Sequence, residues 1–205
     1  MMSKAITPLL TRIVFATLLS AGASPFVKAD EFYDYYDAYN KGDYAGAAVK
    51  IEPLAKKGVA EAQYLLATMF EWGKAYRQDW KTAVEWYSKA AEQGHPLAQM
   101  HVGLAYELGQ GTTQNYFKAQ KWYWRAALHG NEFAQYELGK LRYFGKGSPR
   151  DILGAYVMES VAATNGWVDA EELRDRAAAE LSPEQIAIGK ATAEKCLSSK
   201  YEYCE

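Results

Sequence analysis

The side chains best suited to chemistry in this sequence are three histidines, two cysteines and a pair of glutamates. The histidines, His95, His101 and His129, stand apart, and no cluster of cysteine, histidine and carboxylate residues surrounds them as a metal site would require. His95 and His129 lie beside glycines that recur along the chain, which predicts a surface or helix-terminal position. We therefore expect neither a bound metal ion nor a cofactor.

Glu71 and Glu107 occupy equivalent positions 36 residues apart. We interpret them as repeated surface charges and not as an acid/base pair. The sequence contains no zinc-protease, serine-hydrolase, phosphate-binding-loop or dinucleotide-binding motif, and no serine is followed by lysine three positions later. It therefore predicts a protein that is not an enzyme and has no catalytic residue.

The first 29 residues have the features of a secretory signal peptide. Lys4 and Arg12 provide a positive start, residues 13–21 are apolar, and small residues offer a cleavage site after Ala29, with Ala23 as the alternative. The apolar run is too short for a membrane anchor, which needs roughly 18 residues. We expect export, to the bacterial periplasm or alternatively by secretion, and no membrane insertion once the leader is removed.

Loss of the leader would change the formal net charge of the chain from −2 to −5. A mildly acidic chain without a basic tract is poorly suited to binding nucleic acid, so nucleic acid is not expected as a partner. An even number of cysteines in an exported protein favours a disulfide, here between Cys196 and Cys204. So short a loop would contribute about 2 kcal/mol and pin the C-terminus locally. The alternative, a redox pair, lacks the C-x-x-C spacing.

The elements that position these residues recur with a period of 36. Alanines, glycines and glutamines coincide when the chain is shifted by this distance, and such a period is typical of stacked supersecondary units. The matching sets include Ala62, Ala98, Ala134 and Ala170; Gly58, Gly94, Gly130 and Gly166; and Gln63, Gln99 and Gln135.

Each unit reads as two helices. The first carries apolar residues at helical spacing and stops at Gly73, Gly109 or Gly145, where a residue free to adopt positive φ can end a helix. Asp79, Asn115 and Asp151 then stand where a side chain can cap the second helix. One such hairpin cannot bury its apolar face alone, whereas a stack of hairpins can.

We divide the chain into four parts on this pattern. Residues 1–29 are the signal peptide, 30–59 an N-terminal capping helix pair, 60–167 three full repeats, and 168–205 C-terminal capping helices with the probable disulfide. Ser182 to Gln185 resembles a capping box with proline at the first helical position, opening a final helix.

The repeated segments AQYLLATMFEWG and DWKTAVEWYSKAAEQGHPLAQ resemble Sel-one-like repeats (the SLR family), a branch of the tetratricopeptide-like helical solenoids. The resemblance implies an all-α fold, a right-handed α–α superhelix of helix-turn-helix units that binds proteins or peptides. Family units usually carry G-x-G between the helices, but the first unit has Gly73 and Ala75, which predicts a differently shaped loop.

By analogy with tetratricopeptide arrays, the first helices should line a concave groove. Its apolar and aromatic composition predicts a binding surface for another protein or peptide. Tyr64, Met100 and Tyr136 could instead pack against neighbouring units. The predicted partner-binding residues are Tyr64, Trp72, Met100, Leu104, Leu108, Phe133, Tyr136, Tyr143 and Phe144.

These observations predict an exported adaptor that binds an envelope protein or peptide in its groove. Two alternatives stay open. One is a β-lactam-binding or peptidoglycan-modifying enzyme of the cysteine-rich branch that the resemblance brings in, although this chain has no cysteine between residues 30 and 195. The other is a carbohydrate-binding solenoid, since exposed tryptophan and tyrosine also stack on sugars.

Overall fold

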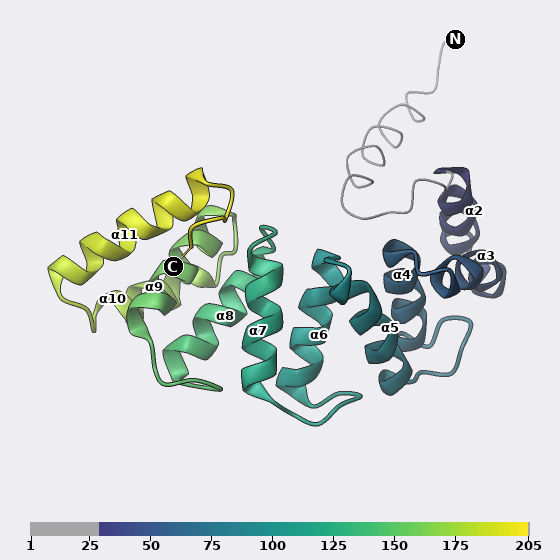
Figure 1. Ribbon diagram of the computed structural model, residues 1–205, viewed down its shortest axis with the longest axis horizontal. Helices are drawn as coiled ribbons and strands as arrows, with labels where there is room; N and C mark the ends of the chain where they lie inside the picture. Colours follow the sequence, from purple (N-terminus) through teal and green to yellow (C-terminus); the bar gives the residue numbers. More distant parts are fainter. Residues whose placement is uncertain (1–28, 205) are drawn as a thin grey trace, which may run out of the picture.

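The computed structural model describes residues 29–204, which form helices joined by loops, with no strand among them. Figure 1 shows the helices side by side in one elongated row. None of the helices within residues 29–204 is both long and apolar enough to cross a membrane. The helices are α2 (Ala29–Asn40), α3 (Tyr44–Lys56), α4 (Ala60–Glu71), α5 (Trp80–Glu92), α6 (Pro96–Leu108), α7 (Tyr116–Ala127), α8 (Glu132–Phe144), α9 (Ile152–Thr164), α10 (Ala170–Ala178) and α11 (Pro183–Ser198).

From α2 to α10, each helix packs against the next one along the chain, so the fold is a solenoid of helical hairpins. This confirms the predicted all-α solenoid with a period of 36. The repeats consist of α4 with α5, α6 with α7, and α8 with α9. Residues 1–28 of the predicted leader, which spans residues 1–29, lie outside the described residues, and its last residue, Ala29, is the first residue of α2.

The helix ends follow the predicted caps. The side chains of Asp79, Asn115 and Asp151 accept hydrogen bonds from backbone amides three residues later, at 3.1, 2.9 and 2.8 Å. Gly109 and Gly145 end α6 and α8 in the left-handed conformation, with φ of 71° and 64°. The capping box at the start of α11 is also present.

The sequence predicted a differently shaped loop in the first repeat, because Ala75 replaces the second glycine of G-x-G. The backbone at this residue is nevertheless similar to that of the second repeat. Ala75 has a φ of 66°, close to 69° at Gly111. Only glycine fits at Gly111, because a Cβ atom there would overlap the backbone of Trp80. Ala75 adopts the same positive φ with its side chain in place, so the sequence departs from G-x-G without changing the backbone at this residue.

Contact between repeats depends on alanines and on a recurring amide. Alanines at positions 62, 98 and 134 are fully buried and allow the helices to approach closely. Gln63, Gln99 and Gln135 are buried beside them, and each Nε2 donates to the carbonyl oxygen of an alanine near the end of the preceding helix, at 3.2 Å. The repeated glutamine is therefore a tie between one unit and the next.

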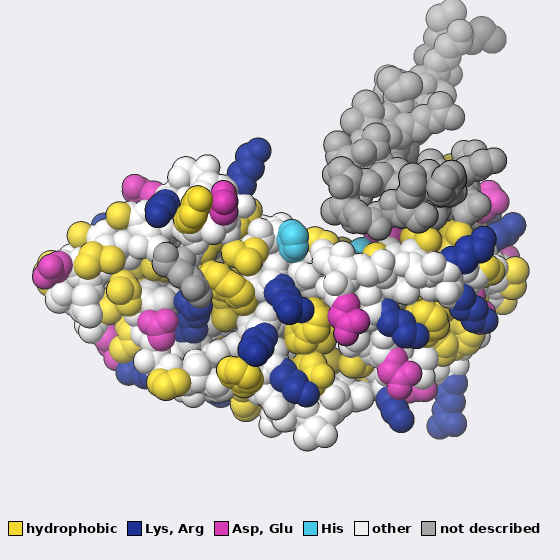
Figure 2. All heavy atoms as spheres, viewed as in Figure 1, with side chains coloured by type: hydrophobic (Ala, Val, Ile, Leu, Met, Phe, Trp, Pro, Cys, Tyr) yellow, Lys and Arg dark blue, Asp and Glu magenta, His cyan; other side chains and the backbone are white. Residues whose placement is uncertain are grey.

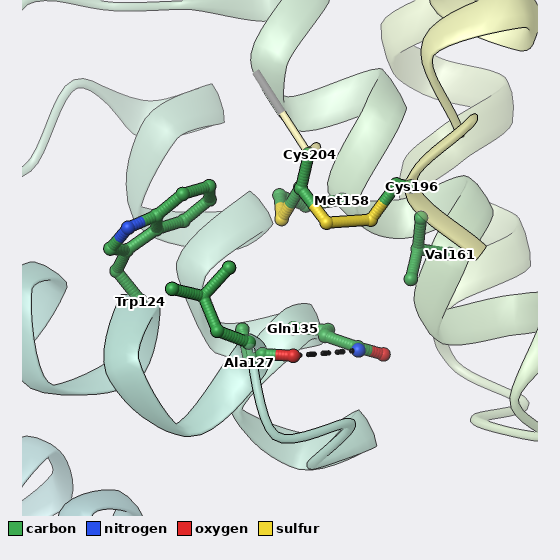
Figure 3. Close-up of a pocket in the computed structure, with 8 residues that line it drawn as sticks. Trp124, Ala127, Gln135, Met158, Val161, Cys196 and Cys204 are labelled. Atoms are coloured by element: carbon green, nitrogen blue, oxygen red, sulfur yellow. Dashed lines mark hydrogen bonds between the residues drawn. A yellow bond between two sulfur atoms is a disulfide. The ribbon is translucent and has the colours of Figure 1, made fainter. Parts of the chain in front are cut away.

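The C-terminal end departs from the repeat. Helix α11 packs against α9, where Gly189 lies so close to the ring of Tyr156 that a Cβ atom would meet it at 2.6 Å. The Cα atoms of Cys196 and Cys204 are 4.4 Å apart with their Sγ atoms at bonding distance, over Trp124 and Met158 (Figure 3). The final turn is thereby fixed over the junction of α7, α8 and α9.

Candidate partner-binding surface

One exposed apolar side chain stands at the end of the first helix in each repeat. Trp72, Leu108 and Phe144 are 65, 53 and 51% exposed, and they occupy equivalent positions at the ends of α4, α6 and α8. Large apolar side chains left in solvent at a repeated position are typical of a surface that a partner covers. The structure thus places three of the predicted contact residues on one row, which we call the apolar row.

Tyr143 is not part of an exposed surface, contrary to the prediction. Its side chain is only 6% exposed because α10 packs over it, and Leu173 and Ala177 of α10 belong to the same buried cluster. The hydroxyl donates to Glu180 Oε1 at 2.5 Å, and the guanidinium of Arg150 lies 4.7 Å from the ring centre. Tyr143 therefore holds the C-terminal cap, and Phe144 is the residue that faces outward.

Tyr64, Met100 and Tyr136 are half-buried. The sequence left two roles open for them, packing against a neighbouring unit or contact with a partner. The ring of Tyr64 stacks on that of His95 with centroids 4.7 Å apart, and Tyr136 stacks on Trp167 at 5.7 Å. Met100 packs against the buried cluster centred on Tyr123 and Leu138. One side of each residue supports the fold, so only the other side remains for a partner.

Leu104 and Phe133 are likewise half-buried against the same cluster. The ring of Phe133 meets Trp167 edge to face, with centroids 5.5 Å apart. Trp167 follows α9 and was not among the predicted contact residues. The signal was present, since Trp167 stands at the position equivalent to His95, which stacks on Tyr64 in the same way.

His95 occupies the helix-terminal position predicted for it. It precedes α6, where Nδ1 accepts a hydrogen bond from the amide of Ala98 at 3.2 Å, and Nε2 lies 2.9 Å from Glu61 Oε2. This imidazole therefore joins α4 to α6 across the repeat boundary. Within residues 29–204 no group of histidine, cysteine and carboxylate residues is arranged to hold a metal ion.

Glu71 and Glu107 are buried, so the prediction of repeated surface charges is wrong. They are 5 and 9% exposed, and each accepts a hydrogen bond from a tyrosine of the following helix. Tyr87 donates to Glu71, and Tyr123 donates to Glu107 at 2.8 Å. Burial raises the pKa of Glu71 above its usual value. The sequence signal was a tyrosine sixteen residues after each glutamate.

The third repeat exchanges these residue types. Tyr143 stands where the other repeats have glutamate, and Glu159 stands where they have tyrosine. Glu159 is fully buried beside Gly139, and neither carboxyl oxygen has a hydrogen-bond partner among the described residues. Burial raises its pKa to about 9, with a further contribution from Glu137, so Glu159 is protonated at neutral pH.

Other titratable groups complete these buried clusters. His101 stacks on Tyr87 with centroids 4.5 Å apart, and burial lowers its pKa to about 4, so its 3.4 Å contact with Glu71 is not an ion pair at neutral pH. Lys140 pairs with Glu137, the residue equivalent to His101, and its Nζ lies 4.0 Å from Glu107. These contacts join neighbouring repeats beneath the apolar row.

Comparison with known proteins gives a consistent result. The Sel1 repeat profile matches residues 60–95, 96–131 and 133–156. The protein is similar to a Sel1 repeat protein of known structure from Oxalobacter formigenes, with 30% identity and a TM-score of 0.64 over 70% of this chain and 57% of that one. No curated protein matches its sequence.

A second solved structure resembles the protein in fold. It is c5321, a protective antigen present in uropathogenic Escherichia coli strains displaying an SLR fold, with 23% identity and a TM-score of 0.57 over 76% of this chain and 42% of that one. The chain therefore spans about half the length of these two proteins.

Proposed function

Because the chain belongs to the Sel1-like repeat family of helical solenoids, whose members are generally protein-interaction modules, we propose that it is an exported adaptor. Its partner is a segment of another envelope protein, bound along the first helices of the repeats. The observation that carries this proposal is the apolar row, in which each repeat leaves one large side chain exposed at the same position.

The spacing of the row suits a linear partner. Trp72, Leu108 and Phe144 recur every 36 residues at the ends of α4, α6 and α8, so the three side chains offer contacts at a repeated position along the array. Tyr64, Met100 and Tyr136 add half-buried apolar surface on the same helices. Large apolar anchors flanked by partly covered neighbours are typical of the residues that dominate binding energy.

The test is recovery of partners from an envelope extract with the triple variant Trp72→Ala, Leu108→Ala, Phe144→Ala. We expect recovery to fall by about tenfold or more, which corresponds to losing about 1.4 kcal/mol of binding free energy. The matched control replaces three exposed apolar residues outside the row with alanine, Val49, Val168 and Ile188. Equal recovery by both folded variants would contradict the proposal.

Export has a separate test. N-terminal sequencing of the protein isolated from the periplasm of a bacterial host should begin at Asp30 if cleavage follows Ala29. Recovery of the uncleaved chain in the cytoplasmic fraction would overturn export without affecting the binding proposal.

A further inference from the structure

The outer side of α7 carries a row of unpaired cations. Lys118, Lys121 and Arg125 are all exposed, and α7 contains no acidic residue between Tyr116 and Ala127. None of the three takes part in an ion pair with the residues that the structure describes. Figure 2 shows dark-blue side chains following one another over α7. We call Lys118, Lys121 and Arg125 the cationic row.

The positions equivalent to the cationic row carry other residue types in the other repeats. On α5 they are Thr82, Glu85 and Lys89, which have no net charge. On α9 they are Gly154, Val157 and Val161, and α11 packs on this side, with Ala193 and Cys196 in the same buried cluster as the two valines. Only on α7 are all three positions cationic, with exposed Phe117 next to them in the sequence.

The cations of α7 are held over aromatic rings. Lys121 Nζ lies 4.6 Å from the ring centre of Phe117, and the guanidinium of Arg125 lies 4.6 Å from that of Trp122. Lys118 Nζ lies 5.0 Å from the ring centre of Tyr106 in the neighbouring helix. Such contacts restrict long side chains before a partner arrives, which reduces the entropy lost on binding.

We propose that the outer side of α7 binds an acidic amphipathic helix of a partner protein, beside the place that α11 occupies on α9. The C-terminal turn already reaches α7, because Trp124 packs against the buried cluster that contains Cys196 and Cys204. In the third repeat a helix, α11, already covers this side. In the second repeat the same side is exposed and positively charged, which complements the charge of an acidic partner.

The spacing of the cations fits carboxylates on one face of a helix. Lys118, Lys121 and Arg125 follow each other at intervals of three and four residues, over about 10 Å of helix axis. Glutamates at one-turn intervals on a partner match this row, while exposed Phe117 offers an apolar contact at its end. The ammonium and guanidinium groups lie over the rings, which favours a charged partner over insertion of the rings into lipid.

The experiment uses the full chain and a labelled 21-residue helical peptide with glutamates at one-turn intervals beside leucines. A second peptide has glutamine in place of every glutamate. Binding is measured by fluorescence anisotropy in about 0.15 M salt, where the Debye length is about 8 Å. We expect the Kd of the glutamate peptide to be at least about tenfold lower, and to rise as added salt screens the charges.

The variant Lys121→Glu with Arg125→Glu should raise that Kd by about tenfold or more. The matched control, Lys81→Glu with Lys89→Glu, makes the same charge change on α5 and should alter it less than about twofold, since its row lies on another repeat. The Trp72→Ala, Leu108→Ala, Phe144→Ala variant should bind the peptide like the wild type, which separates this proposal from the apolar row.

Three results would overturn the proposal. The first is equal affinity for the two peptides. The second is the same loss of binding in both charge-reversal variants, which would indicate attraction by overall charge. The third is binding to vesicles of phosphatidylcholine and phosphatidylglycerol, abolished by Lys121→Glu with Arg125→Glu, without binding to the glutamate peptide.

Discussion

In the first two repeats a tyrosine of the second helix donates to a buried glutamate of the first, whereas in the third repeat the two residue types are exchanged. Tyr87 and Tyr123 satisfy Glu71 and Glu107. In the third repeat Tyr143 donates to Glu180 beyond α10, and the buried Glu159 has no hydrogen-bond partner within residues 29–204. The backbone of the hairpin is kept while its polar chemistry changes.

The difference shows how the array passes into its cap. The first and second repeats are each followed by another repeat, so the same polar arrangement serves both. The third repeat meets α10 and α11 instead, and its tyrosine is used to hold the cap. Glu159 remains at a position where only its neutral form suits the surroundings. The terminal repeat therefore contains a carboxyl group whose burial favours the neutral form, so its stability depends on the protonation of Glu159.

The largest expected effect is that of Glu159→Gln. The folded protein keeps a proton on Glu159 up to about pH 9, whereas the unfolded chain releases it near pH 4.5, so stability falls as pH rises between these values. At pH 7 this lowers the free energy of unfolding by about 3 kcal/mol, and glutamine removes the loss. Urea unfolding at pH 4, 7 and 9 should show a stabilisation by Glu159→Gln that is near zero at pH 4 and grows with pH. A constant difference across the three pH values would contradict the assignment.

An intermediate effect should separate Tyr123→Phe from Tyr143→Phe. Removing the hydroxyl of Tyr123 leaves buried Glu107 without its donor and should lower the free energy of unfolding by about 2 kcal/mol. Glu180 is exposed and keeps its contacts with Arg150 at 2.7 and 2.9 Å, so Tyr143→Phe should cost less than about 1 kcal/mol. Thermal and urea unfolding of the two variants compare them directly. Equal losses would mean that the two tyrosines play the same part.

The smallest effect concerns the glycines that face the exchanged residues. A Cβ atom on Gly103 would lie 2.7 Å from the ring of Tyr123, whereas on Gly139 it would meet the carboxyl end of Glu159, which can move. Alanine gains about 1 kcal/mol of helix propensity at either site. We expect Gly103→Ala to be destabilised by about 1 kcal/mol and Gly139→Ala to be close to the wild type in urea unfolding. The reverse order would show that the carboxyl group is more tightly held than the ring.

The repeat, its helices and their caps could be predicted because they depend on residues close in sequence. Asp79, Asn115 and Asp151 act within three residues of their own position, and Gly109 and Gly145 act within a single turn. These signals need no knowledge of the rest of the chain. Because the unit recurs every 36 residues, each capping residue and each glycine signal occurs in several copies.

The parts that sequence reasoning missed depend on which element covers a position. Glu71 and Glu107 look like surface charges until the tyrosines of the next helix are placed over them. Tyr143 looks equivalent to exposed neighbours until α10 packs on it. The period shows that positions are equivalent, but the neighbour that buries them lies elsewhere in the chain. Trp72, Leu108 and Phe144 lie on one exposed row because no following element within residues 29–204 covers these positions at the C-terminal ends of α4, α6 and α8.

The amide tie between repeats has a consequence for the length of the protein. Gln63, Gln99 and Gln135 make the same hydrogen bond to the preceding unit, so each junction uses one common set of contacts. A segment of one period can then be removed, or a copy inserted, without either new junction losing its tie. The C-terminal end does not share this freedom, since α11 packs against α9 and the Cys196–Cys204 disulfide lies over residues of α7, α8 and α9. Gain and loss of units is thus confined to the interior, and the number of side chains in the apolar row can change one at a time.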